Sequence, residues 1–433
     1  MKITYTTSVL TALAAIFLPV AGALAADGNV GDEVPLPTGQ TTVAQGTWLG
    51  GDYLTGDWGG KRTELADKGY TFFAYLNGIV AKNVSGGIKT GSSSATDLYA
   101  GMTVDLQKSM GWAGWTFNLS GINRAGSSID DDVGGIYSVM QLVGGQTYFL
   151  YNVSLEKAWD NGKHALKFGR ITATDDFVGS PFYGYYLSNS IDGQIRAVLF
   201  DGVMTSYPFA VWGARYQYTP NDGFRAKLGV YQLTENMWDP DYHGTDFAFR
   251  SSDGVSVMGQ LEWNWKSAGK PGHFNLGMNA VSFAMPDFDS DSTTKPFYRY
   301  YAQIDQQVTA RSEGSERGLY LFGTTAYTNQ QKPALVPFQV SLGAQYVGPF
   351  DGRSQDRAIF GTTYGKLSDD YAAEQQSLGK GDPTYEWVLE LGYRFQLSKF
   401  AYIQPDVQYV VRPGGTGDIP NATVIGVQFG VSL

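Results

Sequence analysis

The sequence contains no cysteine and only three histidines among its 433 residues, and after position 25 no apolar run approaches about 20 residues. The lack of cysteine excludes a disulfide framework and a thiolate metal site. The lack of long apolar runs excludes membrane-spanning helices. No Gly-x-Ser-x-Gly, Walker or His-Glu-x-x-His motif is present, and His164, His243 and His273 are far apart in the chain. The sequence therefore predicts no catalytic site, no metal and no cofactor.

The first 25 residues have the pattern of a secretory signal peptide. Lys2 is followed by an apolar run over Val9–Val20, and Ala23-Leu24-Ala25 provides a small-x-small cleavage site. The apolar run is too short to cross a bilayer as a helix. We expect the exported chain to begin near Ala26.

The net charge disfavours a nucleic-acid partner, and the hydropathy indicates a structure with one apolar and one polar face. The 31 basic and 41 acidic residues give a net charge of −10, or −11 without Lys2, which disfavours a nucleic-acid partner. Aromatic residues make up 14% of the chain, yet the mean hydropathy is −0.20. Apolar and polar side chains must therefore be interleaved, as in a β-barrel with one face in lipid and one in water.

The alternation of apolar and polar residues predicts strands from residue 70 onward. In one segment Leu98, Met102 and Val104 alternate with Thr103 and Asp105, and segments of about ten such residues match a tilted transmembrane strand. The predicted strands are 70–81, 98–106, 115–120, 148–157, 165–171, 195–207, 210–218, 224–233, 255–265, 274–284, 317–327, 338–346, 357–364, 386–396, 401–411 and 423–433. Barrels with about 16 strands leave an aqueous channel.

No linker or composition shift divides the chain after about residue 70, so the sequence predicts one all-β domain, a transmembrane antiparallel β-barrel over residues 70–433. Residues 26–69 form an N-terminal segment at the barrel mouth, with a short helix over Gly60–Lys68 that ends at Gly69. Longer polar stretches over 126–146, 234–253 and 286–316 are expected to be loops. A soluble β-sandwich or lectin also alternates, but aromatic residues at strand ends such as Trp115 favour the membrane.

Several motifs resemble the OprB-type carbohydrate-selective porins of the bacterial outer membrane. They are Gly56-Asp57-Trp58-Gly59-Gly60-Lys61-Arg62, Phe168-Gly169-Arg170-Ile171 with Asp175-Asp176-Phe177, Arg317–Phe322, Gly392–Phe395, and Ile403-Gln404-Pro405-Asp406-Val407-Gln408-Tyr409 continuing to Gly415. The resemblance implies an outer-membrane barrel that passes glucose and related sugars by facilitated diffusion. One departure is the C-terminal residue, which is Leu433 where outer-membrane barrels usually end in an aromatic.

A sugar channel needs hydrogen-bonding groups and flat aromatic faces at its narrowest part. The candidate pore-lining residues are Asp57, Trp58, Arg62, Arg124, Arg170, Arg215, Arg225, Lys227, Glu262, Asp406 and Gln408. By the parity of their strands, further lumen-facing candidates are Asp105, Asn118, Glu156, Glu386, Glu390 and Arg394. Candidate stacking faces are Trp238, Tyr242, Tyr183, Tyr185 and Tyr186. Pairing of the wall charges with one another, and a purely structural turn at Trp58, stay open as alternatives.

Other functions fit the sequence less well. Asp287, Asp289 and Asp291 have the spacing that opens a calcium loop, but Ser292 replaces the glycine that follows, so surface acid is the better interpretation. A general or anion-preferring porin is the main alternative, and an outer-membrane hydrolase is a weaker one. The expected partners are small sugars, outer-membrane lipid and lipopolysaccharide, and the barrel-assembly machinery. The sequence does not distinguish a monomer from a homotrimer.

Overall fold

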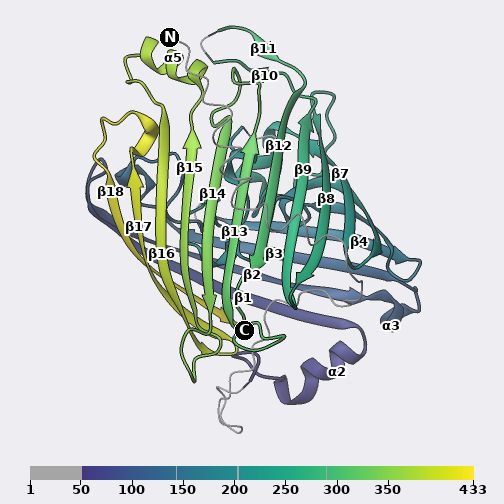
Figure 1. The fold of residues 1–433 in the computed structure, drawn as a ribbon. Helices are drawn as coiled ribbons and strands as arrows, with labels where there is room; N and C mark the ends of the chain where they lie inside the picture. Colours follow the sequence, from purple (N-terminus) through teal and green to yellow (C-terminus); the bar gives the residue numbers. More distant parts are fainter. Residues whose placement is uncertain (1–50, 143, 202–203, 289) are drawn as a thin grey trace.

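The structure, a computed structural model, describes residues 51–142, 144–201, 204–288 and 290–433, and its strands form one closed antiparallel barrel. The predicted signal peptide lies outside the described residues. Consecutive barrel strands pair along the chain, and the first pairs with the last, so the sheet has no free edge (Figure 1).

The barrel strands are β1 (Tyr70–Ser85), β2 (Gly91–Asp105), β3 (Trp115–Gly126), β4 (Tyr148–Trp159), β5 (His164–Ile171), β6 (Val211–Asn221), β7 (Phe224–Leu233), β8 (Gly254–Ser267), β9 (Lys270–Val281), β12 (Phe297–Gln307), β13 (Gly318–Tyr327), β14 (Phe338–Val347), β15 (Arg357–Lys366), β16 (Tyr385–Ser398), β17 (Ala401–Val411) and β18 (Ala422–Ser432).

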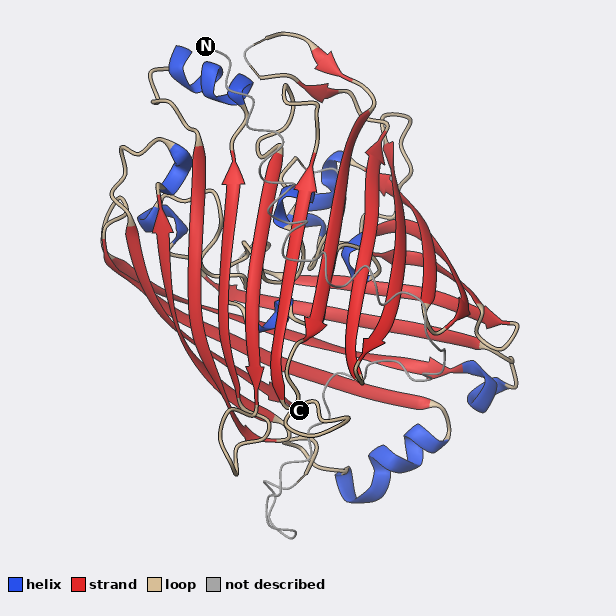
Figure 2. Ribbon diagram, viewed as in Figure 1, coloured by secondary structure: helices blue, strands red, loops and turns tan. Residues whose placement is uncertain are grey.

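Short helices occur only at the ends and inside of the barrel among the described residues (Figure 2). Their bounds are η3 (Trp58–Gly60), α2 (Lys61–Asp67), α3 (Leu106–Met110), α4 (Asp130–Val133), η4 (Ala173–Asp175), η5 (Tyr183–Tyr185), η6 (Arg196–Val198), η7 (Glu235–Trp238), η8 (Pro240–Tyr242), α5 (Asp369–Ser377) and η9 (Pro413–Gly415). A two-stranded piece, β10 (Met285–Pro286) with β11 (Thr293–Thr294), lies in the connection from β9 to β12. No helix in the part of the chain that the structure describes has the length and apolarity to cross a membrane.

Side-chain alternation explains the two faces of the sheet. Leu228, Leu261 and Leu391 point outward and are 53%, 39% and 57% exposed. Glu390 and Gln339 point inward and are buried, although the interior of a channel would be expected to leave them in water. Something inside the barrel therefore covers the inward face.

The predicted fold is confirmed, with sixteen barrel strands and a short N-terminal helix, but one predicted strand is wrong and one was missed. The described residues of this predicted strand, 195–201 and 204–207, form no strand; η6 and the turns around it lie inside the barrel. Residues 286–316, predicted as a loop, contain β12. Each of these two errors has a physical cause. Ile195, Val198 and Met204 are apolar because they pack on the inner wall. In β12, tyrosines lie on both faces, with Tyr300 outward and Tyr301 buried inward.

Glycines let aromatic rings lie flat on the inner wall. Phe322 in β13 is paired with Gly343 in β14, and a Cβ atom built on Gly343 would stand 2.1 Å from the Phe322 ring. Tyr301 covers Gly277 in the same way, with a contact of 2.2 Å. Phe322 in turn packs against Tyr186 from the interior of the barrel.

We expect Gly343→Val to push Phe322 inward and to lower the free energy of unfolding by about 2 kcal/mol, the usual cost of overpacking. Urea unfolding in detergent micelles, followed by tryptophan fluorescence, measures this change. Gly259→Ala is the matched control, because the nearest atom to a Cβ there is 4.0 Å away. Equal stabilities of the two variants would contradict the packing argument.

Candidate functional site: two loops inside the barrel

Two long connections fold into the barrel and cover its inner face. We call residues 127–142 and 144–147, between β3 and β4, inner loop A, and residues 172–201 and 204–210, between β5 and β6, inner loop B. Inner loop B leaves the wall at β5, yet its backbone is hydrogen-bonded to side chains of β8, β12, β14, β16 and β17. The loop therefore crosses the lumen to the opposite wall.

Glutamines of the inner wall hold inner loop B by its backbone. Their side-chain amides donate to carbonyl oxygens that no strand or helix uses, and because the loop is buried, these groups need such partners. The bonds are Gln303 to Val178 (3.0 Å), Gln345 to Phe182 (2.7 Å), Gln404 to Tyr185 (2.7 Å) and Gln339 to Ser190 (3.3 Å).

Two wall glutamates bind backbone N–H groups of the same loops. Glu390 accepts from the amides of Leu187 (2.5 Å) and Ser188 (3.2 Å) on inner loop B. Glu386 accepts from Ile136 and Tyr137 on inner loop A at 2.7 and 2.9 Å. These bonds give partners to loop N–H groups that would otherwise be buried and unpaired.

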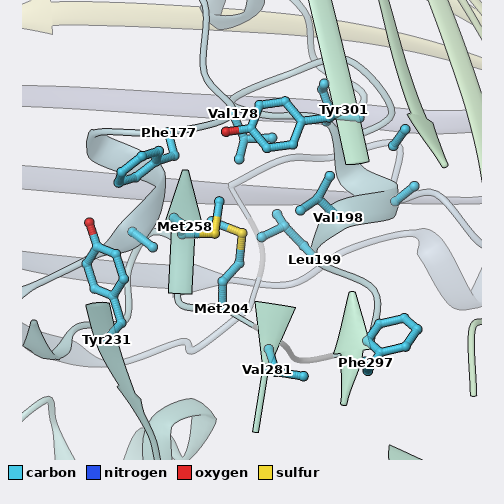
Figure 3. Packing of buried hydrophobic residues seen from close by; sticks show 14 of the residues in the cluster. Phe177, Val178, Val198, Leu199, Met204, Tyr231, Met258, Val281, Phe297 and Tyr301 are labelled. Carbon is cyan, nitrogen blue, oxygen red and sulfur yellow. The ribbon is translucent and has the colours of Figure 1, made fainter. Parts of the chain in front are cut away.

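Apolar packing completes the attachment. Val178, Val198 and Met204 of inner loop B lie against Met258 of β8 and Tyr301 of β12 in one buried cluster (Figure 3). A second cluster joins inner loop A to β1, β2, β16, β17 and β18, and its members include Val139, Met140, Ile79, Val388 and Val424. The interior of this barrel is thus a packed core on two sides, and the lumen is the space that the loops leave.

Charged residues of β4 to β8 form a paired set around the start of inner loop B. Asp176 receives Lys167 at 2.9 Å and Arg215 at 3.0 Å, and Arg215 also reaches Glu156 at 3.3 Å. The backbone oxygen of Asp176 accepts from Lys227 at 2.9 Å. Burial acts to raise the pKa of Asp176, but the two cations outweigh it and hold that pKa below its usual value.

The pair Lys227 and Glu262 extends this set to β8. Lys227 lies 2.6 Å and Arg225 3.4 Å from carboxylate oxygens of Glu262. The structure therefore brings four of the predicted pore residues together: Arg215, Arg225, Lys227 and Glu262. In this group the wall charges pair with one another across neighbouring strands, which is the alternative that the sequence left open.

Arg124 lies at another part of the lumen, beside an aromatic stripe. Its Nε donates to Asp97 at 2.9 Å and its guanidinium lies 4.8 Å from the ring centroid of Tyr207. The Tyr207 hydroxyl also donates to Asp97, at 2.7 Å. We call the inward-facing rings next to this group the aromatic stripe: Phe73, Tyr75, Tyr99, Tyr151 and Tyr207, with neighbouring centroids 5.0 to 6.3 Å apart.

The N-terminal motif lies at the end of the barrel that carries the short turns. Asp57 accepts from the backbone N–H of Thr63 at 2.9 Å and so fixes the start of α2. Arg62 lies 4.3 Å from the ring centroid of Trp58 and donates to the carbonyl of Leu433 at 2.9 Å. These three predicted residues tie the N-terminal segment to the C-terminus at the barrel seam, which fits the structural alternative for Trp58.

Arg170 does not line the lumen, in contrast to its prediction as a pore-lining residue. It pairs with Trp212 on the outward parity of β5 and β6. The connection 234–253 covers it, and its guanidinium donates to the carbonyls of Asp246 and Ala210. Trp238 and Tyr242 belong to this same connection, and Tyr242 is 39% exposed. Its position could not be read from the sequence, because the connection that covers it is distant along the chain.

The other predicted residues divide between anchoring and wall positions. Gln408 donates to the carbonyl of Val139 on inner loop A at 3.0 Å. Asp406 points inward on β17, paired with Gly392 of β16. Asn118 accepts from Thr103 at 3.0 Å on the inner wall, and Asp105 caps α3. Tyr183 and Tyr186 are buried as loop packing.

The described residues hold no group of three or more His, Asp or Glu side chains arranged for a metal ion. Asp289 of the calcium-like spacing lies outside the described residues, and Asp287 uses its carboxylate to accept from Ser292 and Thr294.

Sequence reasoning missed the anchoring glutamines and the path of inner loop B across the lumen to the opposite wall. Gln303, Gln339, Gln345 and Gln404 alternate with apolar residues as ordinary wall positions do, so only their partners distinguish them. The one available signal was length: the chain from Ile171 to Val211 is far longer than ordinary connections between strands.

We expect Glu390→Ala to free inner loop B locally, because it leaves the buried amides of Leu187 and Ser188 unpaired at a cost of about 1–3 kcal/mol each. Hydrogen–deuterium exchange should then accelerate in peptides covering 181–192 and not in those covering β13 or β14. The control is Glu313→Ala, which alters an exposed residue of a short turn. Unchanged protection of inner loop B would show that Glu390 does not hold it.

Comparison with known proteins agrees with this architecture. The family described as "Carbohydrate-selective porin, OprB family" matches residues 89–433. Porin B of Pseudomonas aeruginosa is 27% identical over 417 residues, which cover 87% of this chain and 90% of that protein. The structure of Pseudomonas putida OprB at high pH superposes with a TM-score of 0.85 at 25% identity, covering 89% of this chain and 99% of its own.

The low-pH structure of Pseudomonas putida OprB has the same coverage, with a TM-score of 0.60 and 22% identity, and supports the fold. The family and these relatives are porins, which are channels and not enzymes. The closed barrel, its apolar outer face and its loop-lined interior are the features of such a channel. The chain belongs to the OprB family of carbohydrate-selective porins, the β-barrel channels of the bacterial outer membrane.

Proposed function

We propose that this channel carries glucose-like monosaccharides into the periplasm by facilitated diffusion. The observation that supports the proposal most is the aromatic stripe beside the group of Arg124 and Asp97. A pyranose ring has apolar faces, which stack on aromatic rings, and hydroxyl edges, which exchange hydrogen bonds with planar polar groups. Both kinds of partner occur together along β1 to β4.

The stripe presents rings that a passing sugar can use. Phe73, Tyr75 and Tyr99 are half-buried, so part of each ring is covered by the wall and part is open to the lumen. Phe73 and Tyr99 lie 5.0 Å apart, and Tyr75 and Tyr99 are stacked at 6.3 Å. A series of weak, equivalent contacts lets a solute advance without being trapped, which is what conduction requires.

The wall amides and inner loops support selectivity by fixing the size of the passage. Because inner loop B is bound to the far wall by Gln303, Gln345 and Glu390, the lumen cannot widen without breaking buried hydrogen bonds. A passage of fixed width discriminates between solutes by size, as a selective channel requires.

Liposome swelling tests sugar selectivity directly. In vesicles containing the purified channel, glucose should enter several times faster than a zwitterion of the same hydrodynamic size, because only the sugar gains stacking contacts worth about 1 kcal/mol each. Equal rates for the two solutes would rule out selectivity and favour the general porin.

The stripe itself is tested by Tyr99→Ala. In planar bilayers, we expect the glucose concentration that half-blocks the ion current to rise by about five- to tenfold, since roughly 1 kcal/mol of stacking is lost. Tyr346→Ala is the matched control: Tyr346 lies in β14, faces outward and is 44% exposed. If both variants shift the glucose titration equally, the stripe is not the sugar-binding surface.

A further inference from the structure

Several buried oxygen atoms of the inner wall have no hydrogen-bond donor. Asp406 of β17 is 7% exposed, and both of its carboxylate oxygens are buried without a hydrogen-bond partner. Gln408, two residues further along the same inward face, is 1% exposed, and its Oε1 is also buried without a partner. Such atoms are uncommon in folded proteins, because each has lost the hydrogen bonds that it makes in water.

Glu390 of β16 brings a second carboxylate to the same place. It pairs directly with Gln408 across the two strands, and its carboxyl group interacts with that of Asp406. Asp406 leans toward β16 over Gly392, where a Cβ atom would stand 2.6 Å from the Asp406 Oδ2. Gly392 and Glu390 lie on the same face of β16. We call Glu390, Asp406 and Gln408 the oxygen cluster.

The negative charge of the oxygen cluster is not balanced by a basic side chain. No Arg, Lys or His of the described residues forms an ion pair with Glu390 or Asp406. The neighbouring Gln404 is different: its Nε2 donates to the carbonyl of Tyr185 and its Oε1 accepts from Arg394, so both ends of the amide are used. Two adjacent buried carboxylates repel each other and lose their hydration, so a cation or a shared proton must lie between them.

The amide of Gln408 favours a cation over a shared proton. Its orientation is fixed, because its Nε2 donates to the carbonyl of Val139 at 3.0 Å. A proton shared by Glu390 and Asp406 leaves the Gln408 Oε1 without a donor, whereas a cation takes this oxygen as a third ligand. Calcium suits the cluster, because it binds both carboxylate and amide oxygens in flexible geometry and its charge of +2 matches two carboxylates.

The oxygen cluster lies where both inner loops attach to the wall. Glu390 accepts from the amide of Leu187 on inner loop B. Gln408 donates to the carbonyl of Val139 on inner loop A. The two loops are also bonded to each other here, since the backbone N–H of Gln141 donates to the carbonyl of Leu187 at 2.9 Å. An ion in the oxygen cluster therefore braces both loops against β16 and β17.

We propose that the oxygen cluster binds one calcium ion, which fixes inner loops A and B to the wall. Glu390 and Asp406 supply carboxylate oxygens, Gln408 supplies its amide oxygen, and water completes the coordination. The sequence alone predicted no metal, because the two carboxylates come from different strands and the third ligand is an amide. The inference concerns the position of the loops and is independent of the solute that the channel carries.

Equilibrium dialysis with radioactive calcium tests the site. The channel, refolded in a nonionic detergent without lipopolysaccharide, should bind about one more calcium ion than D406N, with a dissociation constant of about 0.1–1 mM, the range of extracellular calcium modules. D291N is the matched control, because Asp291 is an exposed acid in the connection from β9 to β12, and it should bind as the wild type does. Equal binding by the wild type and D406N, or loss of the ion in D291N instead, would overturn the proposal.

Hydrogen–deuterium exchange tests the effect of the ion on the loops. In about 5 mM CaCl2, exchange in wild-type peptides covering 136–142 and 181–192 should be about 6- to 50-fold slower than in NaCl of the same ionic strength, because opening of the loops then requires release of the ion. D406N should show no difference between the two salts. Equal slowing in the wild type and D406N, or no slowing in either, would overturn the proposal.

Folding of the variants is checked separately. Heat-modifiable migration on gels shows whether D406N forms a barrel. If it does not, E390Q takes its place in the binding test, because glutamine keeps the shape of Glu390 and an acceptor for the amide of Leu187. The wild type is decisive on its own: a channel that binds no calcium at about 5 mM, well above the expected dissociation constant, has carboxyl groups that share a proton, and the proposal is overturned.

Discussion

The organisation of this channel depends on the hydrogen bonds between wall side chains and the backbone of inner loop B. A connection that crosses the interior of a barrel leaves its N–H and C=O groups away from bulk water, and each unpaired group would cost about 1–3 kcal/mol. Inward glutamines and Glu390 provide the missing partners. In a barrel with an empty interior these inward polar side chains would be hydrated. Here they bind inner loop B, and the bound loop narrows the lumen.

This constraint divides the lumen into surfaces with different tasks. Where the loops attach, polar side chains of the wall form their hydrogen bonds with the loops and not with a solute. Examples are Glu386, Gln339 and Gln408. Where inner loop B begins, the charges of β4 to β8 neutralise one another around Asp176. The surface that keeps free binding capacity is the aromatic stripe. It continues along the inward face of β1 to Asn77, which accepts a hydrogen bond from Tyr402.

Much of the fold followed from the sequence because alternation is a local property. The outward faces of β8, β14 and β16 are apolar at every second position, so their range and parity could be read from single segments. The helix α2 was recognisable from its stop at Gly69, whose φ of 94° suits glycine. The family resemblance rested on motifs at both ends of the chain, and the comparisons confirm it.

The interior could not be derived in the same way. Parity along β16 shows that Arg394 and Glu390 both face inward. It does not show that Arg394 lies against aromatic rings, or that Glu390 accepts hydrogen bonds from two loop amides. The strand predicted at 195–207 failed because packing inside a barrel gives a segment the apolar character of a strand. Arg170 was misplaced because a neighbouring loop covers the outward face above a short strand. Each of these depends on contacts between segments distant in sequence.

The position of inner loop B is the most direct test of this account. Since the chain has no cysteine, spin labels can be attached at only two engineered sites, Gly184→Cys at the loop tip and Leu391→Cys on the outer wall. A Cβ at Gly184 has no neighbour within 4 Å, and Leu391 is 57% exposed, so both labels fit. Pulsed electron spin resonance in lipid nanodiscs should give one narrow distance distribution. A broad distribution, with the loop tip sampling the whole lumen, would contradict the claim that the wall holds the loop in place.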